Sequence, residues 1–328
     1  MTWHLFAGST REWDALVVSL GARTPFQLSA WAIFRKTFNW NALRLVSPDG
    51  RGAVQLLTRA VGPLHVAWAA GGPLGDLSQS DLENLATSVA TLLSGKILYL
   101  RIADHSPQSE TREQLFRRAG WSRPARQIVT NHTLIRDLHE SEFTSDNGYS
   151  SNWSRNLRRG QQRNVTAEVW ASPDPVVIAR LHRDVEATKG AFSADWRANE
   201  EALRNLISSF GDQLRVIRAV DATGQTLSIR AATIHGSYAF DFLAATSIEG
   251  RKCYASNVAM HELLVASAAQ GATSYDFGGV DRRENKGVYD FKHGAGGIEH
   301  HYVGEFEYVT PRIAKPIVSK LVALRLSA

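Results

Sequence analysis

The chain has 328 residues, of which 44% are hydrophobic and 21% are charged, and its formal net charge is +5. This balance is typical of a folded globular protein. It excludes a largely disordered chain, because disordered chains contain too few apolar residues to form a core. The length predicts two domains of roughly 150 residues each. The excess of basic residues favours phosphate-rich partners such as RNA or nucleotides.

The sequence lacks the patterns of a secreted or membrane-spanning protein. The N-terminus has no basic stretch followed by a sustained apolar run. The most apolar window, residues 60–74, is too short to span a bilayer and is interrupted by glycine and proline. The single cysteine, Cys253, excludes an internal disulfide and a multi-cysteine metal site. We therefore expect a soluble cytoplasmic protein with no metal centre.

Hydrophobic periodicity in the first half predicts helices and strands in alternation. In chain order we expect a helix, a hairpin of two strands, a helix, a strand, a helix and a strand, over residues 28–38, 43–46 with 53–57, 80–94, 97–102, 111–119 and 127–135. Ser80 is the predicted N-cap of the second helix, and Gly95 is expected to end it. This order is typical of an α/β fold.

The second half repeats this order of elements. We expect two helices, three strands, a helix and a strand, over residues 176–187, 199–210, 214–219, 227–234, 238–244, 256–270 and 274–277. The order alone predicts a duplicated α/β unit, namely two tandem acetyltransferase-like (GNAT) domains with mixed, largely antiparallel sheets flanked by helices. We place the N-terminal domain at residues 1–145 and the C-terminal domain at residues 146–328.

A basic segment opens the second domain. Residues 153–165 form an expected helix in which four arginines share one arc of roughly 140°, at 100° per residue; they are Arg155, Arg158, Arg159 and Arg163. Trp153 and Leu157 fall on the opposite side. A solvated charged face is the simpler interpretation. The absence of any acidic residue between Trp153 and Ala167 favours instead a surface that binds phosphates.

A second cationic group lies in the loop of residues 247–255, which is expected to join a strand to a helix. Its candidate phosphate-binding residues are Arg251, Lys252 and Tyr254. Free amides at a helix N-terminus attract anions, so this corner suits a phosphate or a carboxylate. A basic turn without function is the alternative. The loop lacks the Arg/Gln-x-x-Gly-x-Gly/Ala run usual in acetyltransferases, which argues against ordinary coenzyme A binding.

The most informative segment runs from Tyr275 to Tyr308. It contains Tyr-Asp-Phe-Gly-Gly from Tyr275, Gly-Val-Tyr-Asp-Phe-Lys from Gly287, a glycine-rich turn and Val-Gly-Glu from Val303. This order resembles the C-terminal signature of the Fem family of aminoacyl-tRNA-dependent amino-acid transferases, whose members extend peptidoglycan cross-bridges. Weaker similarities, among them the basic segment, extend the resemblance over most of the chain.

The resemblance implies two acetyltransferase-like domains, an aminoacyl-tRNA donor and an amine acceptor on a precursor that carries a nucleotide diphosphate or a lipid. It implies no metal and no cofactor besides the tRNA co-substrate. Family members with a long helical arm carry a charged heptad run in the second domain. This sequence has none, so it resembles the compact type. The acceptor stays open, because related compact enzymes also acylate surface-polysaccharide sugars or build small peptides.

The resemblance also implies roles for individual residues. Lys292, which follows a strand-like aromatic, is expected to stabilise charge at the reacting ester, and Phe291 is expected to shape the donor site. A fixed cation lowers the barrier because an oxyanion forms when an amine attacks an ester. On the acceptor side the family pattern maps to Arg35 or Lys36 and to Asp104. A surface ion pair is the simpler interpretation of these acceptor residues.

The general base and the exact reaction stay open. Asp104, Asp276 and Asp281 are the carboxylates that could take the proton of the attacking ammonium. The first candidate function is transfer of an amino acid from aminoacyl-tRNA to a peptidoglycan precursor or a related peptide or amino compound. The second is transfer from acyl-CoA or an acyl carrier protein to a sugar amine. The third is RNA binding without catalysis. The basic helix favours the first, and the sequence does not predict the oligomeric state.

Overall fold

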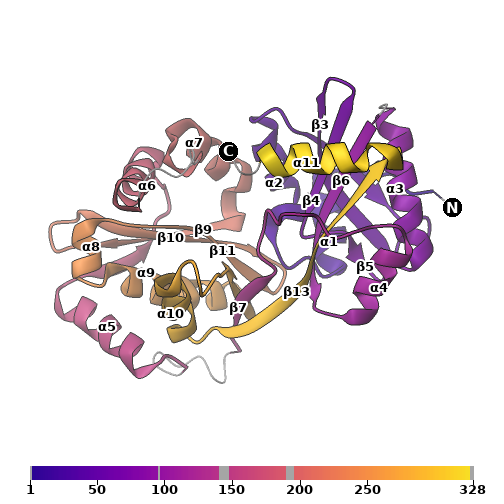
Figure 1. The fold of residues 1–328 in the computed structure, drawn as a ribbon. Coiled ribbons are helices and arrows are strands. Elements are labelled where there is room, and N and C mark those ends of the chain that lie inside the picture. Colours follow the sequence, from indigo (N-terminus) through magenta and orange to yellow (C-terminus); the bar gives the residue numbers. More distant parts are fainter. Residues whose placement is uncertain (1, 95–96, 140–147, 190–195, 326–328) are drawn as a thin grey trace. The chain divides into compact units, whose positions relative to one another are not determined.

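The computed structural model describes residues 2–94, 97–139, 148–189 and 196–325. The chain divides into two compact units, one formed by Met1–His132 with His300–Ala328 and the other by Thr133–Glu299 (Figure 1). The first and last segments of the sequence therefore belong to the same unit. The domain boundary predicted between residues 145 and 146 lies outside the described residues.

The first unit is built on a sheet with the strand order β1-β2-β3-β4-β6-β13, with the short β5 beside β3. The strands are β1 (His4–Leu5), β2 (Asn41–Val46), β3 (Gly52–Val61), β4 (Leu64–Ala70), β5 (Leu74–Gly75), β6 (Ile97–Pro107) and β13 (Ile298–Thr310). Neighbouring strands are antiparallel except β4 and β6, which run parallel. The strand beside β6 thus comes from the C-terminal part of the chain.

Helices pack on this sheet through their apolar residues. They are α1 (Thr10–Ser19), α2 (Ser29–Lys36), α3 (Gln79–Leu93), α4 (Glu110–Arg118) and α11 (Lys315–Arg325). α3 buries Leu82 and Leu85 in the main core of the unit. Ser78 is its N-cap, and the prediction of Ser80 was wrong. The Ser78 hydroxyl accepts from the Asp81 amide while the Asp81 carboxylate accepts from the Ser78 amide, which satisfies two donors at the start of the helix.

A buried ion pair joins two neighbouring strands of the first unit. Arg101 on β6 contacts Glu305 on β13, and their side chains are 3% and 1% exposed. The Glu305 carboxylate also accepts from the backbone amides of Ile128 at 3.0 Å and Val129 at 2.9 Å. A carboxylate offers about four acceptor positions, so these donors use most of its capacity. The pair therefore ties the segment around Ile128 to the sheet.

The second unit has its own sheet, with the order β7-β12-β11-β10-β9-β8. The strands are β7 (His132–Asp137), β8 (Thr166–Val169), β9 (Leu214–Val220), β10 (Thr226–His235), β11 (Tyr238–Thr246) and β12 (Ser274–Gly279). β11 and β12 run parallel, and the other neighbours are antiparallel. The sheet is mixed and largely antiparallel, as the sequence predicted.

The helices of the second unit are α5 (Ser151–Gln162), α6 (Pro175–Lys189), α7 (Glu200–Phe210), α8 (Ile248–Lys252), α9 (Ala255–Ala269) and α10 (Lys286–Gly294). α9 contacts β9, β10 and α5, and it buries residues such as Met260 and Leu263. α5 buries Trp153 and Leu157, so the amphipathic pattern predicted for this segment is confirmed. Across the described helices, none has the length and apolar character that a bilayer crossing requires.

Two predicted segments differ from the structure. The strand expected at residues 127–135 begins only at His132, because the backbone before it bonds to the Glu305 carboxylate. Lys292 does not follow a strand aromatic but lies on α10, whose first turn is capped by the Asn285 side chain accepting from the Val288 amide. The α/β class with helices flanking mixed sheets is confirmed.

Candidate active site

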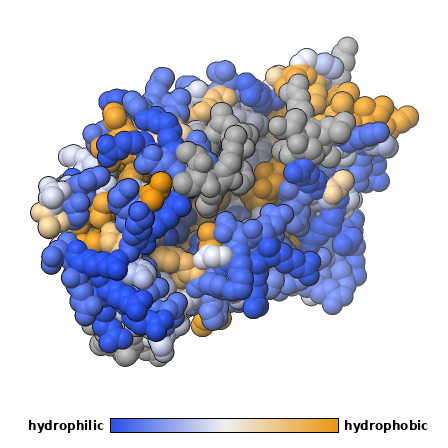
Figure 2. Space-filling model, turned by 60° about the vertical axis from the view of Figure 1, so that its left-hand side comes forward, coloured by the Kyte–Doolittle hydropathy of each residue, from blue (hydrophilic) through white to orange (hydrophobic). Residues whose placement is uncertain are grey.

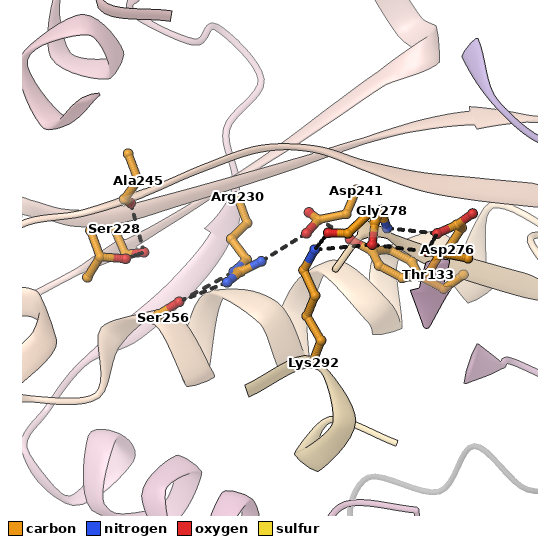
Figure 3. A network of polar contacts seen from close by, with 12 residues as sticks. Thr133, Ser228, Arg230, Asp241, Ala245, Ser256, Asp276, Gly278 and Lys292 are labelled. Atoms are coloured by element: carbon orange, nitrogen blue, oxygen red, sulfur yellow. Dashed lines mark hydrogen bonds and ion pairs between the residues drawn. The ribbon is translucent and has the colours of Figure 1, made fainter. Parts of the chain in front are cut away.

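Lys292 lies in the last turn of α10 and points toward the strand ends of the second unit (Figure 3). Its ammonium donates to the backbone carbonyls of Gly278 at 3.3 Å and Gly279 at 3.1 Å. The side chain is half-buried. Main-chain oxygens at the end of β12 therefore fix the position of this cation, while part of it stays accessible.

The turn at Gly278 sets the position of those carbonyls. Gly278 has a φ of +71°, a backbone conformation that glycine adopts without the steric cost that a side chain adds. The Asp276 carboxylate accepts from the Gly278 amide at 2.7 Å. The Thr133 hydroxyl contacts both Asp276 and the Gly278 carbonyl. The Tyr-Asp-Phe-Gly-Gly segment thus builds the carbonyl pair that holds Lys292.

A buried ion pair faces the same site (Figure 3). Arg230 on β10 contacts Asp241 on β11 at 3.1 Å, and their side chains are 9% and 7% exposed. The Tyr275 hydroxyl donates to the other Asp241 oxygen at 3.2 Å. Arg230 also donates to the Ser256 hydroxyl at 3.3 Å, at the start of α9. We call these four residues together with Lys292 the Lys292 cluster.

A β-bulge places Arg230 and Asp241 on the same face of the sheet. The register of β10 against β11 shifts by one residue between Ala231 and Ala232, so that Phe242 is an extra residue on β11. Side chains alternate along a strand, so without this bulge Asp241 would face the opposite side. Bulges that re-aim a side chain in this way are frequent beside active sites.

Burial sets the charge balance of the Lys292 cluster. It lowers the pKa of Lys292, an effect that Asp241 opposes and Arg230 reinforces. It raises the pKa of Asp241, against the influence of Arg230 and Lys292. Burial and the Asp241 charge raise the pKa of Tyr275 well above its usual range, so the phenol remains a hydrogen-bond donor. Groups whose pKa values are shifted by burial beside a specific charge partner are frequent at functional sites.

Phe291, the neighbour of Lys292 on α10, packs against the Lys292 cluster. The Arg230 guanidinium carbon lies 4.6 Å from the centre of the Phe291 ring. On another side, the Trp153 ring of α5 lies 6.0 Å away, centre to centre. The structure therefore brings the two predicted catalytic residues together with Arg230, and connects them to the helix that carries the predicted basic face.

The predicted basic segment and the predicted loop come together at one surface. Arg159 of α5 donates to the Tyr254 hydroxyl at 3.4 Å. The Arg163 guanidinium carbon lies 5.4 Å from the centre of the Tyr254 ring, and the same side chain donates to the Lys252 carbonyl. Most of the loop is the short helix α8, and Arg251 and Lys252 are exposed on it. These residues form one cationic surface, which we call the α5 basic face.

Two further arginines of the α5 basic face have local contacts. Arg155 donates to the Asn152 side chain at 2.7 Å. Arg158 is directed to the Ser154 carbonyl at 3.5 Å, the long limit of a hydrogen bond. Both arginines are exposed, so they add positive charge to the surface.

The start of α9 connects the α5 basic face to the Lys292 cluster. Tyr254, which contacts the arginines, immediately precedes α9 and has a φ of +60°. Ser256, two residues later, accepts from Arg230. Unpaired amides at a helix start add partial positive charge. The arginines at Tyr254, the start of α9 and Arg230 therefore place three sources of positive charge next to one another. This arrangement suits a ligand that combines phosphates with a reactive carbonyl group.

The predicted acceptor residues Arg35 and Lys36 lie on α2 of the first unit. The Arg35 guanidinium carbon is 5.4 Å and 5.1 Å from the ring centres of Trp31 and Phe38, and burial lowers its pKa, with a further effect of Arg59. Lys36 is exposed and lines a cavity of about 350 Å³. Of these two cations, Lys36 is therefore the one that a ligand in this cavity would meet.

Asp104, the third predicted acceptor residue, is 1% exposed in β6. It pairs with Arg112 at 2.8 Å and accepts from the Ser106 amide at 2.8 Å. It lines a second cavity of about 180 Å³, together with Arg23 and His105. The structure thus pairs Asp104 with the partly buried Arg112 and does not bring it into one cavity with Lys36.

The other carboxylates considered as bases differ in exposure. Asp276 is 4% exposed and holds the Gly278 turn. Asp281 is exposed and accepts from the amides of Arg283 and Glu284 in its own turn. Asp276 therefore has a structural function in the turn, whereas Asp281 stays open to solvent.

Sequence reasoning missed Arg230 and Asp241, and it gave Tyr275 no role of its own within the signature segment. The signal for Arg230 and Asp241 was a single charge inside each of two apolar strand patterns, residues 227–234 and 238–244, which were expected to be neighbours. Lone charges of opposite sign on adjacent buried strands are expected to pair, because an unpaired buried charge is costly.

Comparisons with known proteins agree with this architecture. The family described as "Acetyltransferase (GNAT) domain" matches residues 149–293. FemX has a TM-score of 0.81 at 18% identity, over 96% of this chain and 100% of its own. L-PGS from Bacillus licheniformis has a TM-score of 0.59 at 14% identity, over 97% and 96% of the two chains. A tandem GNAT protein from the clavulanic acid biosynthesis pathway has a TM-score of 0.55 at 12% identity, over 94% and 98%.

No curated protein sequence matches the chain significantly. At these identities the solved structures establish the fold, and the resemblance to the Fem family is confirmed at that level. The domain match supports an acyltransferase and includes the Lys292 cluster. The chain thus has a FemX-like fold of the GNAT type, with its candidate active site inside the matched domain.

Proposed function

We propose that this protein is an aminoacyltransferase that moves an amino acid from aminoacyl-tRNA to the amine of an acceptor and forms an amide bond. The acceptor would be a peptidoglycan precursor or a related peptide or amino compound. The observation that supports the proposal best is the meeting of the α5 basic face and the Lys292 cluster at the start of α9. The first group suits phosphates and the second suits a reacting ester. Aminoacyl-tRNA combines both features.

The α5 basic face would hold the tRNA. Its exposed arginines carry fixed charge and planar donor pairs that match phosphate oxygens. Binding of this kind releases counterions and therefore weakens as the salt concentration rises. Tyr254 adds an aromatic ring on which a nucleotide base can stack.

Lys292 would act at the ester. The acceptor nitrogen attacks the ester carbonyl carbon, and a C–N bond forms as the carbonyl oxygen becomes negative. The C–O bond to the tRNA ribose then breaks, and the ribose oxygen takes up the proton that the amine releases. The Lys292 ammonium stabilises the negative oxygen while it develops. Asp241 supports the charged form of that lysine against the effect of burial.

A second candidate is an N-acyltransferase that uses acyl-CoA or an acyl carrier protein and acts on a sugar amine. The match to a GNAT domain favours it, as does the exposed Arg251 beside the start of α9, where a pyrophosphate can bind. This donor also needs an oxyanion stabilised at Lys292, so the two candidates differ in the donor and not in the catalytic group.

The deciding experiment offers the purified protein a pool of radiolabelled aminoacyl-tRNAs and candidate amine acceptors, and in parallel labelled acyl-CoA. Lys292→Ala tests the catalytic group. Lys286→Ala is the matched control, because Lys286 lies on the same helix but is exposed and paired with Asp290. Binding of tRNA is measured separately with Arg158→Gln/Arg159→Gln, and Arg204→Gln serves as an exposed arginine control on α7.

We expect one amino acid to leave tRNA and enter an amide product. Transfer should fall by about a hundredfold or more in Lys292→Ala and stay unchanged in Lys286→Ala. Transfer from acyl-CoA with none from tRNA would favour the second candidate. Tight tRNA binding that Lys292→Ala leaves unchanged, with no transfer to any acceptor, would identify an RNA-binding protein without catalysis.

A further inference from the structure

Exposed aliphatic side chains form a row on the C-terminal helix of the first unit. On the face drawn in Figure 2 the surface is mostly hydrophilic, with hydrophobic residues in smaller areas. Ile313, Ile317 and Leu321 are 88%, 67% and 55% exposed. They are four residues apart on α11 and the short helix before it, Arg312–Ala314, so they follow one side of the helix. Single exposed aliphatic residues are ordinary, whereas a continuous row marks an interaction surface.

A different side of α11 attaches the helix to the protein. Val318 is buried, and Val322 packs into the same apolar cluster, with Tyr99 of β6 and Val309 of β13. Figure 1 shows α11 lying across the strands of this unit. The helix thus buries one apolar side and presents a second to solvent. The exposed row is therefore not needed for attachment.

The surroundings of the row are basic. Residues 311–328 contain four basic residues and no acidic one; the basic residues are Arg312, Lys315, Lys320 and Arg325. Arg312 and Lys320 are exposed. At 100° per residue, Lys320 lies roughly 60° around the helix from Ile317. Lys315 instead donates to the Ser122 hydroxyl on the body of the unit. Two exposed cations therefore lie beside the apolar row, on the same side of it.

We propose that Ile313, Ile317 and Leu321, with Arg312 and Lys320, form a docking surface for an anionic phospholipid membrane. A basic amphipathic helix lies in the plane of a membrane surface, with its aliphatic side chains among the acyl chains and its cations at the headgroups. The net charge of +5 on the whole chain acts in the same direction. The docking does not depend on the identity of the acyl donor.

The row fits a lipid surface better than a protein partner. It is convex, because it lies on the outer side of a single helix, and a fluid membrane needs no matching groove. Three aliphatic side chains also offer far less than the roughly 800 Å² per partner that a stable protein interface buries. The absence of acidic residues over 311–328 complements a negative membrane, which attracts each nearby lysine or arginine.

The test is sedimentation of the full chain with phosphatidylcholine vesicles, with and without phosphatidylglycerol. We expect binding to the anionic vesicles that weakens with salt, and much weaker binding to the neutral ones. Ile313→Ser/Ile317→Ser should lower the partition coefficient by at least about tenfold, because each isoleucine loses its burial in lipid. Lys320→Gln should lower it by about fivefold. Ile128→Ser is the matched control, since Ile128 is 46% exposed elsewhere in the unit.

Two results would overturn the proposal: no binding of the unchanged chain to anionic vesicles, or equal binding by the double variant. Size-exclusion chromatography tests the alternative that a second copy of the chain covers the row. If the unchanged chain forms a dimer and binds no vesicles, and the double variant is a monomer, the row is an interface between copies of the chain. The lipid proposal would then be wrong. Acyl transfer to a soluble acceptor without vesicles should be unchanged in the double variant, so failure of docking can be told apart from failure of the proposed function.

Discussion

Each unit contains a buried arginine–carboxylate pair, and the two pairs are built differently. In the first unit, the Glu305 carboxylate accepts from Arg101 and from two backbone amides. In the second unit, the Asp241 carboxylate accepts from the side chains of Arg230 and Tyr275. Main-chain donors thus help an arginine to hold the first carboxylate, whereas an arginine and a tyrosine side chain hold the second.

This difference separates a structural pair from a functional one. Backbone amides cannot rotate away, so the Glu305 pair is a rigid connection between a strand and a loop. The Asp241 pair instead faces Lys292, a half-buried amine whose pKa is lowered by burial and supported by the Asp241 charge. We infer that the first pair maintains the fold and that the second maintains a charge for chemistry.

The largest expected effect is on stability, in the first unit. Glu305→Gln keeps the shape of the side chain but leaves Arg101 as a buried charge without its counter-charge. We expect the free energy of unfolding to fall by about 4 kcal/mol, measured by urea denaturation. Glu168→Gln, which removes an exposed pair with Arg218, should cost about 0.5 kcal/mol or less. Folded Glu305→Gln should keep its rate of acyl transfer, and a loss of rate would contradict the structural assignment.

The next effect is on catalysis, in the second unit. Lys292→Met keeps the apolar stem of the side chain and removes the cation. We expect the single-turnover rate to fall by about 10²-fold to 10³-fold, because the oxyanion loses its stabilising charge. Urea denaturation should show a change of about 1 kcal/mol or less, since the buried Asp241 carboxylate keeps its ion pair with Arg230 when Lys292 is replaced. If Lys292→Met is clearly less stable but transfers at the normal rate, the second pair would serve the fold, as the first pair does.

The pH dependence of transfer tests the charge that Asp241 supports. Lys292 must be protonated to stabilise an oxyanion, and burial lowers its pKa, so the rate should fall as the pH rises through a value below the usual lysine range. Asp241→Asn removes the charge that opposes this shift. The alkaline limb of the rate profile should therefore move to a pH lower by roughly one unit. Asp290→Asn, on the same helix but paired with Lys286, should leave the limb in place.

Local sequence patterns predicted most of the fold. Hydrophobic periodicity located α3, α9 and the strands β9 to β11 to within a few residues, because each buries one consistent face or run. The pairing of β13 with β6 was not predicted, since it joins segments about 200 residues apart by contacts that leave no local pattern. The N-cap of α3 was missed because Ser78 and Ser80 both suit that position, and only the bond to Asp81 selects the first.

The candidate site was predicted in part. Lys292 and Phe291 were chosen through the family signature, and the structure places both against the Arg230–Asp241 pair; their roles stay predictions. The pair itself could not be read from strand alternation. The bulge at Phe242 reverses the face on which Asp241 lies, and a bulge depends on how two strands align and not on the pattern within either one.

The smallest expected effect concerns Thr133, which we expect to position the lysine through the Gly278 turn. Its hydroxyl contacts Asp276 and the Gly278 carbonyl, and that carbonyl accepts from Lys292. Thr133→Val should lower the transfer rate by about fivefold and stability by about 1 kcal/mol, and Thr133→Ser should restore both. Thr223→Val, in an exposed turn, is the control. If Thr133→Val lowers stability alone, the turn serves the fold just as the Glu305 pair does, and the chemistry of the second unit must rest on Lys292 and Asp241 without it.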